Sequence, residues 1–247
     1  MTTITSQHNP QLKELRKLQR RRERDRRGLF IAEGEDLIAA ATAAGRPVVH
    51  GYRLAGTAIG AGFEDVEESV MAGLSTLGSG TRAIGVYEQR FTKPAGPLCV
   101  YLHGVGDPGN VGTVLRSALA FGASCVALGP DCADPHSPKA VRASMGAIFA
   151  VALARVTDVN ELPGERVALV AHEGEPISGV AHDATPALTL LVGAEREGLP
   201  EHVVQACERV AHISIASESL NAAMAATVAL YETTRGGRDN DDRVPAT

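Results

Sequence analysis

The chain has 247 residues, of which 44% are hydrophobic and 21% charged, with a formal net charge of −5. This length suffices for two domains of ordinary size, and the hydrophobic fraction is typical of a globular protein. Its longest apolar runs are shorter than the roughly 18 residues of a membrane-spanning helix. The polar N-terminus lacks the apolar core of a secretory signal. We therefore expect a cytoplasmic protein without a membrane segment.

Cysteine and histidine do not form a metal-binding pattern. The four cysteines are scattered without a C-x-x-C pair, and the eight histidines lack helical ligand spacing with carboxylates. We therefore predict no metal site. Cys99 and Cys125 fall in predicted strands, where a free cysteine is usually a small buried hydrophobe.

The segment 11–27 carries the strongest charge bias of the chain, with nine basic and three acidic residues. Leu12, Leu15 and Leu18 recur at helical spacing, which predicts a helix with its arginines on the solvent faces. Such a run is either a solvated helix face or a docking surface for a polyanion. Because this segment is strongly basic whereas the chain as a whole is acidic, we favour RNA as its ligand. The candidate RNA-binding residues are Arg16, Lys17, Arg20, Arg21, Arg22 and Arg24.

Strands and helices alternate from residue 29 to residue 87, and this alternation predicts a small α/β domain. The predicted strands are 29–32, 48–54 and 83–87, a helix spans 35–44, and a strand or helix lies within 66–77. Two prolines and a glycine in 93–97 break every periodicity and mark a domain boundary. We expect an N-terminal domain over 1–92, a second domain over 97–235 and a disordered tail over 236–247.

The second domain opens with one βαβ unit. It comprises a strand at 98–102, a helix at 111–121 and a strand at 124–128. Asn110 is the predicted N-cap of the helix, and Gly122 lies where a left-handed C-cap is needed. Arg116 is in this helix, near the carboxyl ends of the strands, where open α/β sheets bind their ligands.

The remaining elements continue a doubly wound α/β pattern. We expect a loop at 130–138, a helix at 140–149, strands at 151–155, 167–171, 188–192 and 211–215, and helices at 200–208 and 218–234. Ser217 or Ser219 is the predicted N-cap of the last helix. The small residues along that helix allow close packing, either within the fold or across a dimer interface.

Three loops of the second domain combine glycine with polar side chains. Residues 104–109 match G-x-G-x-x-G after a strand, with Asp131 farther on, which keeps a Rossmann dehydrogenase as an alternative. Two features argue against a dehydrogenase. The βαβ unit begins only around residue 98, and we expect its helix to begin after the third glycine. The loops 193–200 and 213–221 carry Glu195 and Asn221. Glu195 is either an ordinary surface turn residue or an acceptor for a ligand.

Together these loops resemble the SpoU family of RNA ribose 2′-O-methyltransferases, also called TrmH, of the SPOUT superfamily. The family's three motifs resemble 107–116, 193–198 and 213–232, and 142–147 is also similar to family sequences. The resemblance implies a SPOUT-type doubly wound sheet with a trefoil knot, a homodimer formed through this domain, and S-adenosylmethionine as cofactor. It also implies that 1–92 is an α/β domain that binds the RNA substrate.

The resemblance further implies a set of site residues. The implied cofactor contacts, largely through backbone groups, are Val192, Gly193, Ile213, Ile215, Leu220 and Ala222. Arg116 is the family residue tied to activating the ribose 2′-hydroxyl. Because a guanidinium is an improbable base at neutral pH, we expect Arg116 to position the ribose-phosphate. Asn110, Glu195, Ser219 and Asn221 are expected to fix the RNA and the loops. Ribosomal RNA is a more common family substrate than transfer RNA.

The third motif departs from the family pattern in one respect. Four residues separate Ile215 from Leu220, where many family members have a longer loop with Pro, Met and Gly. A catalytically silent RNA-binding relative therefore stands as an alternative to the enzyme, beside the dehydrogenase.

Overall fold

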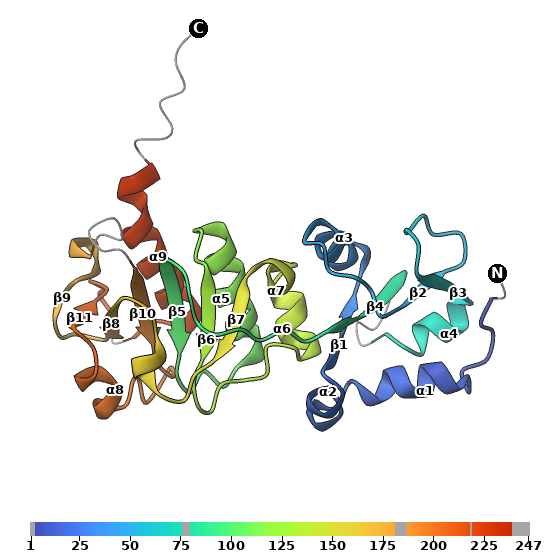
Figure 1. The fold of residues 1–247 in the computed structure, drawn as a ribbon, viewed down its shortest axis with the longest axis horizontal. Helices are drawn as coiled ribbons and strands as arrows, with labels where there is room; N and C mark the ends of the chain where they lie inside the picture. The colour runs from blue at the N-terminus through green and yellow to red at the C-terminus, as the bar shows by residue number, and fades with distance from the viewer. Residues whose placement is uncertain (1–2, 76–79, 181–186, 218, 239–247) are drawn as a thin grey trace, which may run out of the picture. The chain divides into compact units, whose positions relative to one another are not determined.

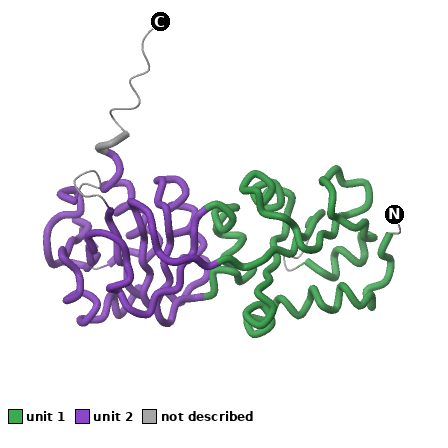
Figure 2. The backbone as a smooth tube through the Cα atoms, in the orientation of Figure 1, with its two compact units in different colours: residues 1–90, 134–150 green, residues 91–133, 151–247 purple. Residues whose placement is uncertain are grey.

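The computed structural model describes residues 3–75, 80–180, 187–217 and 219–238. The chain divides into two compact units, one made of residues 1–90 with 134–150 and the other of residues 91–133 with 151–247 (Figure 2). The predicted domains 1–92 and 97–235 differ from this division in one segment. The prediction assigns 134–150 to the second domain, whereas these residues belong to the first unit. Within the described residues, no helix is long and apolar enough to cross a membrane.

The first unit contains a four-stranded mixed sheet with the strand order β1-β4-β2-β3. Its strands are β1 (Leu29–Glu33), β2 (His50–Leu54), β3 (Phe63–Val66) and β4 (Ala83–Glu88), and its helices are α1 (Pro10–Lys17), α2 (Arg21–Arg27), α3 (Glu35–Ala43) and α4 (Glu68–Ala72). β4 is antiparallel to β1 and β2, whereas β2 and β3 are parallel. The three predicted strands and the helix after β1 are confirmed, whereas β3 was missed.

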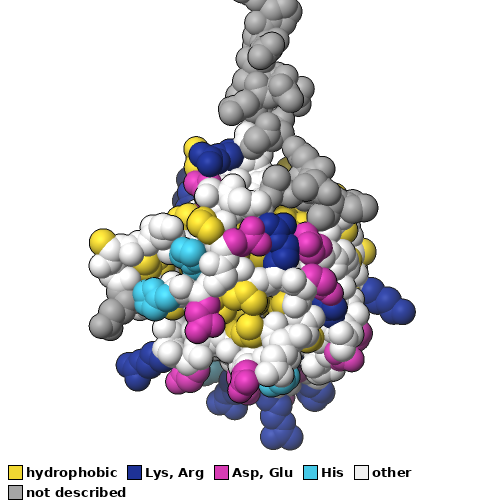
Figure 3. Space-filling model, turned by 90° about the vertical axis from the view of Figure 1, so that its left-hand side faces the viewer, with side chains coloured by type: hydrophobic (Ala, Val, Ile, Leu, Met, Phe, Trp, Pro, Cys, Tyr) yellow, Lys and Arg dark blue, Asp and Glu magenta, His cyan; other side chains and the backbone are white. Residues whose placement is uncertain are grey.

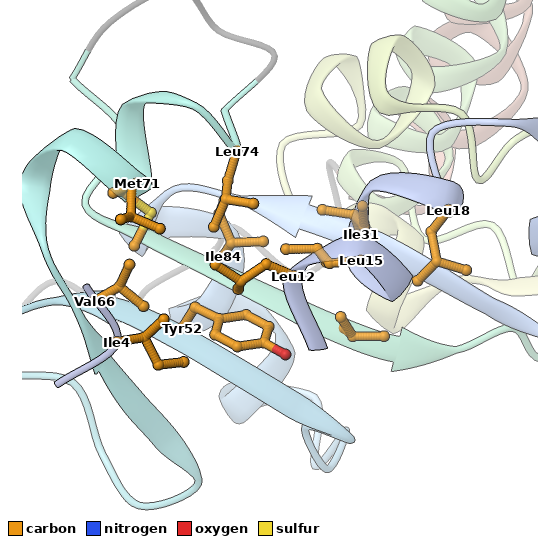
Figure 4. Packing of buried hydrophobic residues seen from close by; sticks show 12 residues of the cluster. Ile4, Leu12, Leu15, Leu18, Ile31, Tyr52, Val66, Met71, Leu74 and Ile84 are labelled. Carbon is orange, nitrogen blue, oxygen red and sulfur yellow. The ribbon is translucent and has the colours of Figure 1, made fainter. Parts of the chain in front are cut away.

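The predicted leucine stripe of the first helix forms part of the core. Leu12, Leu15 and Leu18 are all buried, in one cluster with Tyr52 and Ile84 of the sheet (Figure 4). The stripe is confirmed, but the helical segment breaks in two between α1 and α2. The expectation that its arginines face solvent is wrong for Arg24, which is only 3% exposed.

Arg24 is buried because it binds a carboxylate from the exchanged segment 134–150. Its Nε and Nη2 donate to Asp134 Oδ2 at 2.9 and 2.6 Å, and its Nη1 donates to the carbonyls of Leu18 and Gln19 at 2.8 Å. Asp134 Oδ1 accepts from the His136 backbone N–H at 2.9 Å. Both charges are therefore compensated by hydrogen bonds, as burial of an ion pair requires.

The single helix predicted at 140–149 is wrong, because two short helices occupy this region. α6 (Pro138–Ala143) and α7 (Ala147–Ala150) are separated by Met145 and Gly146, with φ angles of 48° and 93°. A Cβ on Gly146 would lie 2.4 Å from the Cβ of Ala40 in α3, so the close approach requires glycine. Phe149 stacks on Phe30 with ring centroids 5.7 Å apart. Aromatic packing therefore adds to the Arg24–Asp134 pair in holding this segment in the first unit.

The second unit contains a seven-stranded sheet in which all pairs are parallel, with the order β7-β6-β5-β10-β8-β11-β9. Its strands are β5 (Leu98–Leu102), β6 (Cys125–Leu128), β7 (Ala152–Arg155), β8 (Glu165–Val170), β9 (Glu175–Pro176), β10 (Leu188–Val192) and β11 (Arg209–His212). Its helices are α5 (Pro108–Ala120), α8 (Glu201–Gln205) and α9 (Ala222–Arg238), with short 3₁₀ turns at Val159–Glu161 and Ile177–Gly179.

The predicted α/β class with a parallel sheet is confirmed, and the trefoil knot stays a prediction. The central strands β5 and β10 have the predicted bounds and are buried along their whole length. Cys99 and Cys125 are buried as expected. β9 was missed, and α9 continues to Arg238, so residues 236–238 are helical and not tail. The rest of the predicted tail lies outside the described residues. Figure 1 shows α5 and α9 side by side along this sheet.

We predict that Asp134→Ala destabilises the first unit strongly, because it leaves the Arg24 guanidinium buried without a counter-charge. Loss of one partner of a buried ion pair costs roughly 3–5 kcal/mol of unfolding free energy. Denaturant unfolding followed by tyrosine fluorescence measures the change. Arg82→Ala, which removes an exposed pair with Glu35, is the control and should cost under about 1 kcal/mol. Equal effects of the two substitutions would contradict the role assigned to Asp134.

Candidate active site

The loop after β5 is held by an aspartate that caps the following helix. Asp107 Oδ1 accepts from the Asn110 backbone N–H at 3.0 Å, and Pro108 occupies the first turn of α5. Asn110 as the N-cap is therefore wrong, and so is the expected start of the helix after Gly109. Aspartate followed by proline is a favoured start for a helix. Because Asp107 does the capping, the Asn110 side chain is available for other contacts.

The Asn110 side-chain amide connects three loops. Its Nδ2 donates to Glu195 Oε1, and its Oδ1 accepts from Asn221 Nδ2 at 3.1 Å. Asn221 Oδ1 in turn accepts from the backbone N–H groups of Ala223 and Met224 at 3.0 and 3.3 Å. Asn221 is thus the N-cap of α9, and the expected cap at Ser217 or Ser219 and helix start at 218 are wrong. The loops that follow β5, β10 and β11 are joined at this point.

The loop after β10 is a tight turn that depends on glycine. Ala194 and Gly198 exchange backbone hydrogen bonds at 3.0 and 3.2 Å. A Cβ on Gly193 would lie 2.1 Å from the carbonyl carbon of Gly198, so no other residue fits there without a shift of the backbone. Gly198 has a φ of 67°. This turn places the Glu195 carboxylate against Asn110.

A cavity of about 640 Å³ lies at the carboxyl ends of β8, β10 and β11. All six residues expected to contact the cofactor line it, and so do Glu195 and Ser219. The lining residues not predicted are Leu169, Val170, Ala171, Ala194, Arg196, Glu197, Gly198, Leu199 and Ala225. Leu169 to Ala171 end a predicted strand of a parallel sheet, and that position is the signal that could have identified them.

Three other predicted site residues lie outside the cavity lining. Asn110 and Asn221 hold the loops around it, and Arg116 is exposed on α5. Among the described residues, none forms a hydrogen bond or ion pair with the Arg116 guanidinium. Glu195, expected to fix the RNA and the loops, contacts Asn110. The glycines of the G-x-G-x-x-G match also do not line the cavity in the described part of the chain.

The short loop of the third motif still reaches the cavity. Ile215, Ser219 and Leu220 all line it, although only four residues lie between Ile215 and Leu220. Glu218, within this loop, lies outside the described residues. The departure from the family pattern therefore does not remove either end of the motif from the cavity.

Titratable groups near the carboxyl end of β5 favour their neutral forms. Burial lowers the pKa of His103, and the neighbouring His202 lowers it further. The Tyr101 hydroxyl lies 3.0 Å from His103 Nδ1. Burial also raises the pKa of the Cys132 thiol, so a thiolate nucleophile is not favoured. Within the described residues, no group of three metal-ligating side chains is assembled.

The candidate RNA-binding residues of the first unit differ in their partners. Lys17 pairs with Glu14 at 2.6 Å, Arg21 with Asp25 at 3.6 Å, and Arg16 donates to the Gln7 carbonyl at 2.9 Å. Arg24 is buried against Asp134 and is not on the surface. Arg20 and Arg22 are exposed and have no carboxylate partner among the described residues. Figure 3 views the side of the second unit that carries α8 and β9, and there acidic, basic and histidine side chains are interspersed.

Comparison with known proteins finds matches in both parts of the chain. Residues 97–231 match the model of the SpoU rRNA Methylase family, and residues 9–78 match an MRM3-like substrate binding domain. A tRNA/rRNA methyltransferase of Synechocystis, itself uncharacterised, is 28% identical over 95% of this chain and 94% of its own. A 23S rRNA (uridine(2479)-2′-O)-methyltransferase of Streptomyces viridochromogenes is 35% identical over 52% of this chain and 49% of its own.

Solved structures resemble the whole described fold. The AdoMet-bound rRNA methyltransferase of Sinorhizobium meliloti superposes with a TM-score of 0.85 and 29% identity, covering 95% of this chain and 98% of that one. Apart from the Synechocystis protein, the chain spans between 28% and 61% of the length of the curated relatives it matches.

We predict that Asn221→Ala loosens the first turn of α9, because it removes both the helix cap and the bond to Asn110. Loss of an N-cap costs roughly 1 kcal/mol, which accelerates hydrogen exchange of the Ala223 and Met224 amides about fivefold. Exchange measured by NMR or mass spectrometry tests this. Asn221→Ser is the control, because serine can cap the helix but has no amide donor for Asn110. Unchanged exchange in Asn221→Ala would show that the cap contributes nothing.

Proposed function

Because the chain belongs to the SpoU rRNA Methylase family, we propose that it transfers a methyl group from S-adenosylmethionine to a ribose 2′-hydroxyl of ribosomal RNA. The observation that carries this proposal is the cavity at the carboxyl ends of β8, β10 and β11. Most of its lining residues come from the second and third family motifs, and Asn110 of the first motif connects those loops.

The cavity lining suits S-adenosylmethionine, which combines a nucleoside, an aliphatic chain and a positive sulfonium. Ile213, Ile215 and Leu220 supply apolar surface, and the close turn at Gly193 exposes backbone groups for hydrogen bonding. The carboxylates of Glu195 and Glu197 provide negative charge at the lining. When bound, the cofactor supplies an electrophilic methyl group.

Arg116 is proposed to hold the ribose-phosphate of the RNA. A ribose hydroxyl is a poor nucleophile until its proton is removed or its developing negative charge is stabilised. A guanidinium stays charged at neutral pH and binds a phosphate through two parallel N–H groups. Arg116 has no carboxylate partner among the described residues, so its N–H groups are available for such a contact. We therefore assign it positioning and charge stabilisation, not proton abstraction.

The first unit is proposed to bind the RNA. It contains the match to an MRM3-like substrate binding domain, and α1 and α2 carry the cationic cluster. Arg20 and Arg22 are the strongest candidates for phosphate contacts, and Arg16, Lys17 and Arg21 are secondary because each already has a partner. Ribosomal RNA is favoured over transfer RNA because relatives from three species are named 23S rRNA methyltransferases. The cytoplasm is the proposed site of action.

A homodimer through α5 and α9 is also proposed. Met224 and Tyr231 of α9 are 62% and 52% exposed, and Leu119 of α5 is 48% exposed. The two helices pack together, with Ser117 Oγ 2.7 Å from Thr227 Oγ1. Large apolar side chains exposed on neighbouring helices are typical of an interaction surface. Because Arg116 is on α5, this interface would lie close to the RNA site.

Arg116→Ala should abolish methyl transfer and leave cofactor binding intact. Loss of one positioned electrostatic group costs at least about 100-fold in rate. Incorporation of tritiated methyl groups into ribosomal RNA measures transfer, and calorimetry measures S-adenosylmethionine binding. Arg116→Lys keeps the charge without the two-pronged geometry and should be intermediate, whereas Thr113→Ala on the same helix should be nearly neutral. Loss of cofactor binding in a folded Arg116→Ala variant would refute the assignment, and absence of transfer by the unaltered chain would refute the proposed activity.

Met224→Asp combined with Tyr231→Asp should convert the dimer to a monomer, because two charges would be buried at the contact. Sedimentation equilibrium should then report the 25.8 kDa mass of one chain. Val49→Asp replaces an exposed apolar residue of the first unit and should leave the dimer intact. A monomeric unaltered chain, or a dimer that survives both substitutions, would place the interface elsewhere or exclude it.

A further inference from the structure

A second cavity, of about 230 Å³, lies in the first unit between α1 and the sheet. Its lining combines side chains of α1, Arg27 at the end of α2, and residues of β1, β2 and β4. The apolar walls include Leu15, Leu18 and Val86, which are all buried. By the share of liquid volume that each water occupies, about 30 Å³, this space equals roughly eight waters. One flat heterocyclic base fits such a space, whereas a stack of bases does not.

A tyrosine side chain lines this cavity. Tyr52 is only 2% exposed and lines the cavity, and its hydroxyl has no hydrogen-bond partner among the described residues. Figure 4 shows its ring beside Leu12 of α1. The hydroxyl is not one of the enclosed side-chain atoms that lack a partner, so it is accessible from the cavity and can bond a ligand there. Burial raises the pKa of Tyr52 to about 12, so the hydroxyl remains a donor at neutral pH.

The mouth of the cavity carries further polar groups. The Glu14 carboxylate is held by Lys17 and Arg27, which lower its pKa to about 2 and keep it ionised. A carboxylate has more acceptor sites than these two cations occupy. The side chains of Gln11 and His50 also line the cavity and make no hydrogen bond to any described residue. The cavity therefore offers donors and acceptors around an apolar, partly aromatic wall.

We infer that this cavity binds one unpaired nucleobase of the RNA substrate. Single-stranded or bulged bases are recognised by stacking on aromatic rings and by hydrogen bonds to their edges. The exposed ring of His50 can stack on a base, and the side chains of Gln11 and Glu14 can bond its edge. The apolar walls formed by Leu15, Leu18 and Val86 disfavour a charged phosphate inside, because they cannot replace its hydration. The neutral base would enter, while phosphates of the same strand remain outside on cations such as Arg20 and Arg22. This inference rests on the proposed RNA substrate and adds a recognition site to it.

The test uses the full chain and two RNA hairpins, one fully paired and one with a single bulged 2-aminopurine nucleotide. Binding is followed by fluorescence anisotropy, and the 2-aminopurine intensity reports transfer of the base to a new environment. The unaltered chain should prefer the bulged hairpin by about tenfold and change its fluorescence. Gln11→Ala combined with His50→Ala should reduce the preference to about twofold, because the base loses the groups that bond its edge and stack on it.

A matched control uses the same residue types away from the cavity. Gln19→Ala combined with His8→Ala should retain the preference, since both are exposed residues of the first unit that do not line it. Tyr52→Phe keeps the packed ring but removes the hydroxyl, and it should also reduce the preference. Arg20→Glu combined with Arg22→Glu should weaken binding of both hairpins alike and flatten its salt dependence.

The outcomes separate this inference from the proposed activity. If the cavity variants bind both hairpins like the unaltered chain, or if no preference exists, the nucleobase site is overturned, whereas methyl transfer to ribosomal RNA is measured independently. If the chain binds neither hairpin, the result refutes both the nucleobase site and the RNA-binding role of the first unit. Loss of preference in the cavity variants alone, with methyl transfer demonstrated, supports the two proposals together.

Discussion

The side-chain amide of Asn110 is the group on which the arrangement of the candidate active site depends. Its donor binds Glu195, 85 residues away in the chain, and its acceptor binds Asn221, 111 residues away. A parallel sheet brings the carboxyl ends of its strands to one edge but leaves the loops beyond them free to adopt many positions. One amide that donates and accepts at once selects a single arrangement. A carboxylate in its place would repel Glu195, and an apolar residue would leave both partners unsatisfied.

The division of the chain into units depends on a comparable long-range contact. Arg24 and Asp134 are 110 residues apart, and each would be costly to bury alone. Their pairing, with the ring stacking of Phe149 on Phe30, draws a segment of the second half of the chain into the first unit. The segment begins directly after Ala133, whose backbone N–H donates to the carbonyl of Val105 in the loop before α5. The boundary between the segment 134–150 and the second unit is therefore held by a backbone hydrogen bond to the loop that carries the first motif.

The sequence predicts elements well where burial alone decides them, and less well where one side chain decides. β5 and β10 are apolar runs buried on both faces, and both were predicted with the observed bounds. The starts of α5 and α9 were misplaced, because Asp107 and Asn221 compete with nearby Asn and Ser residues of similar capping ability. The residues implied to bind the cofactor line one cavity, because the family motifs that contain them lie at the ends of strands. Arg24 and the break at Met145 depend on partners that no local pattern reveals.

The ion pairs of the basic segment 11–27 decide which of its cations can contact a phosphate. Of the arginines and lysines in α1 and α2, Lys17, Arg21, Arg24, Arg26 and Arg27 all pair with carboxylates supplied by the same unit. Arg27 bridges Glu14 and Glu23 and so joins the two helices. These pairs occupy N–H groups that phosphates would otherwise contact. Arg20 and Arg22 are exposed and have no carboxylate partner among the described residues. Selectivity must then come from contacts that depend on the shape and bases of the RNA. The cavity between α1 and the sheet, lined by Tyr52 and His50, lies where such a contact would form.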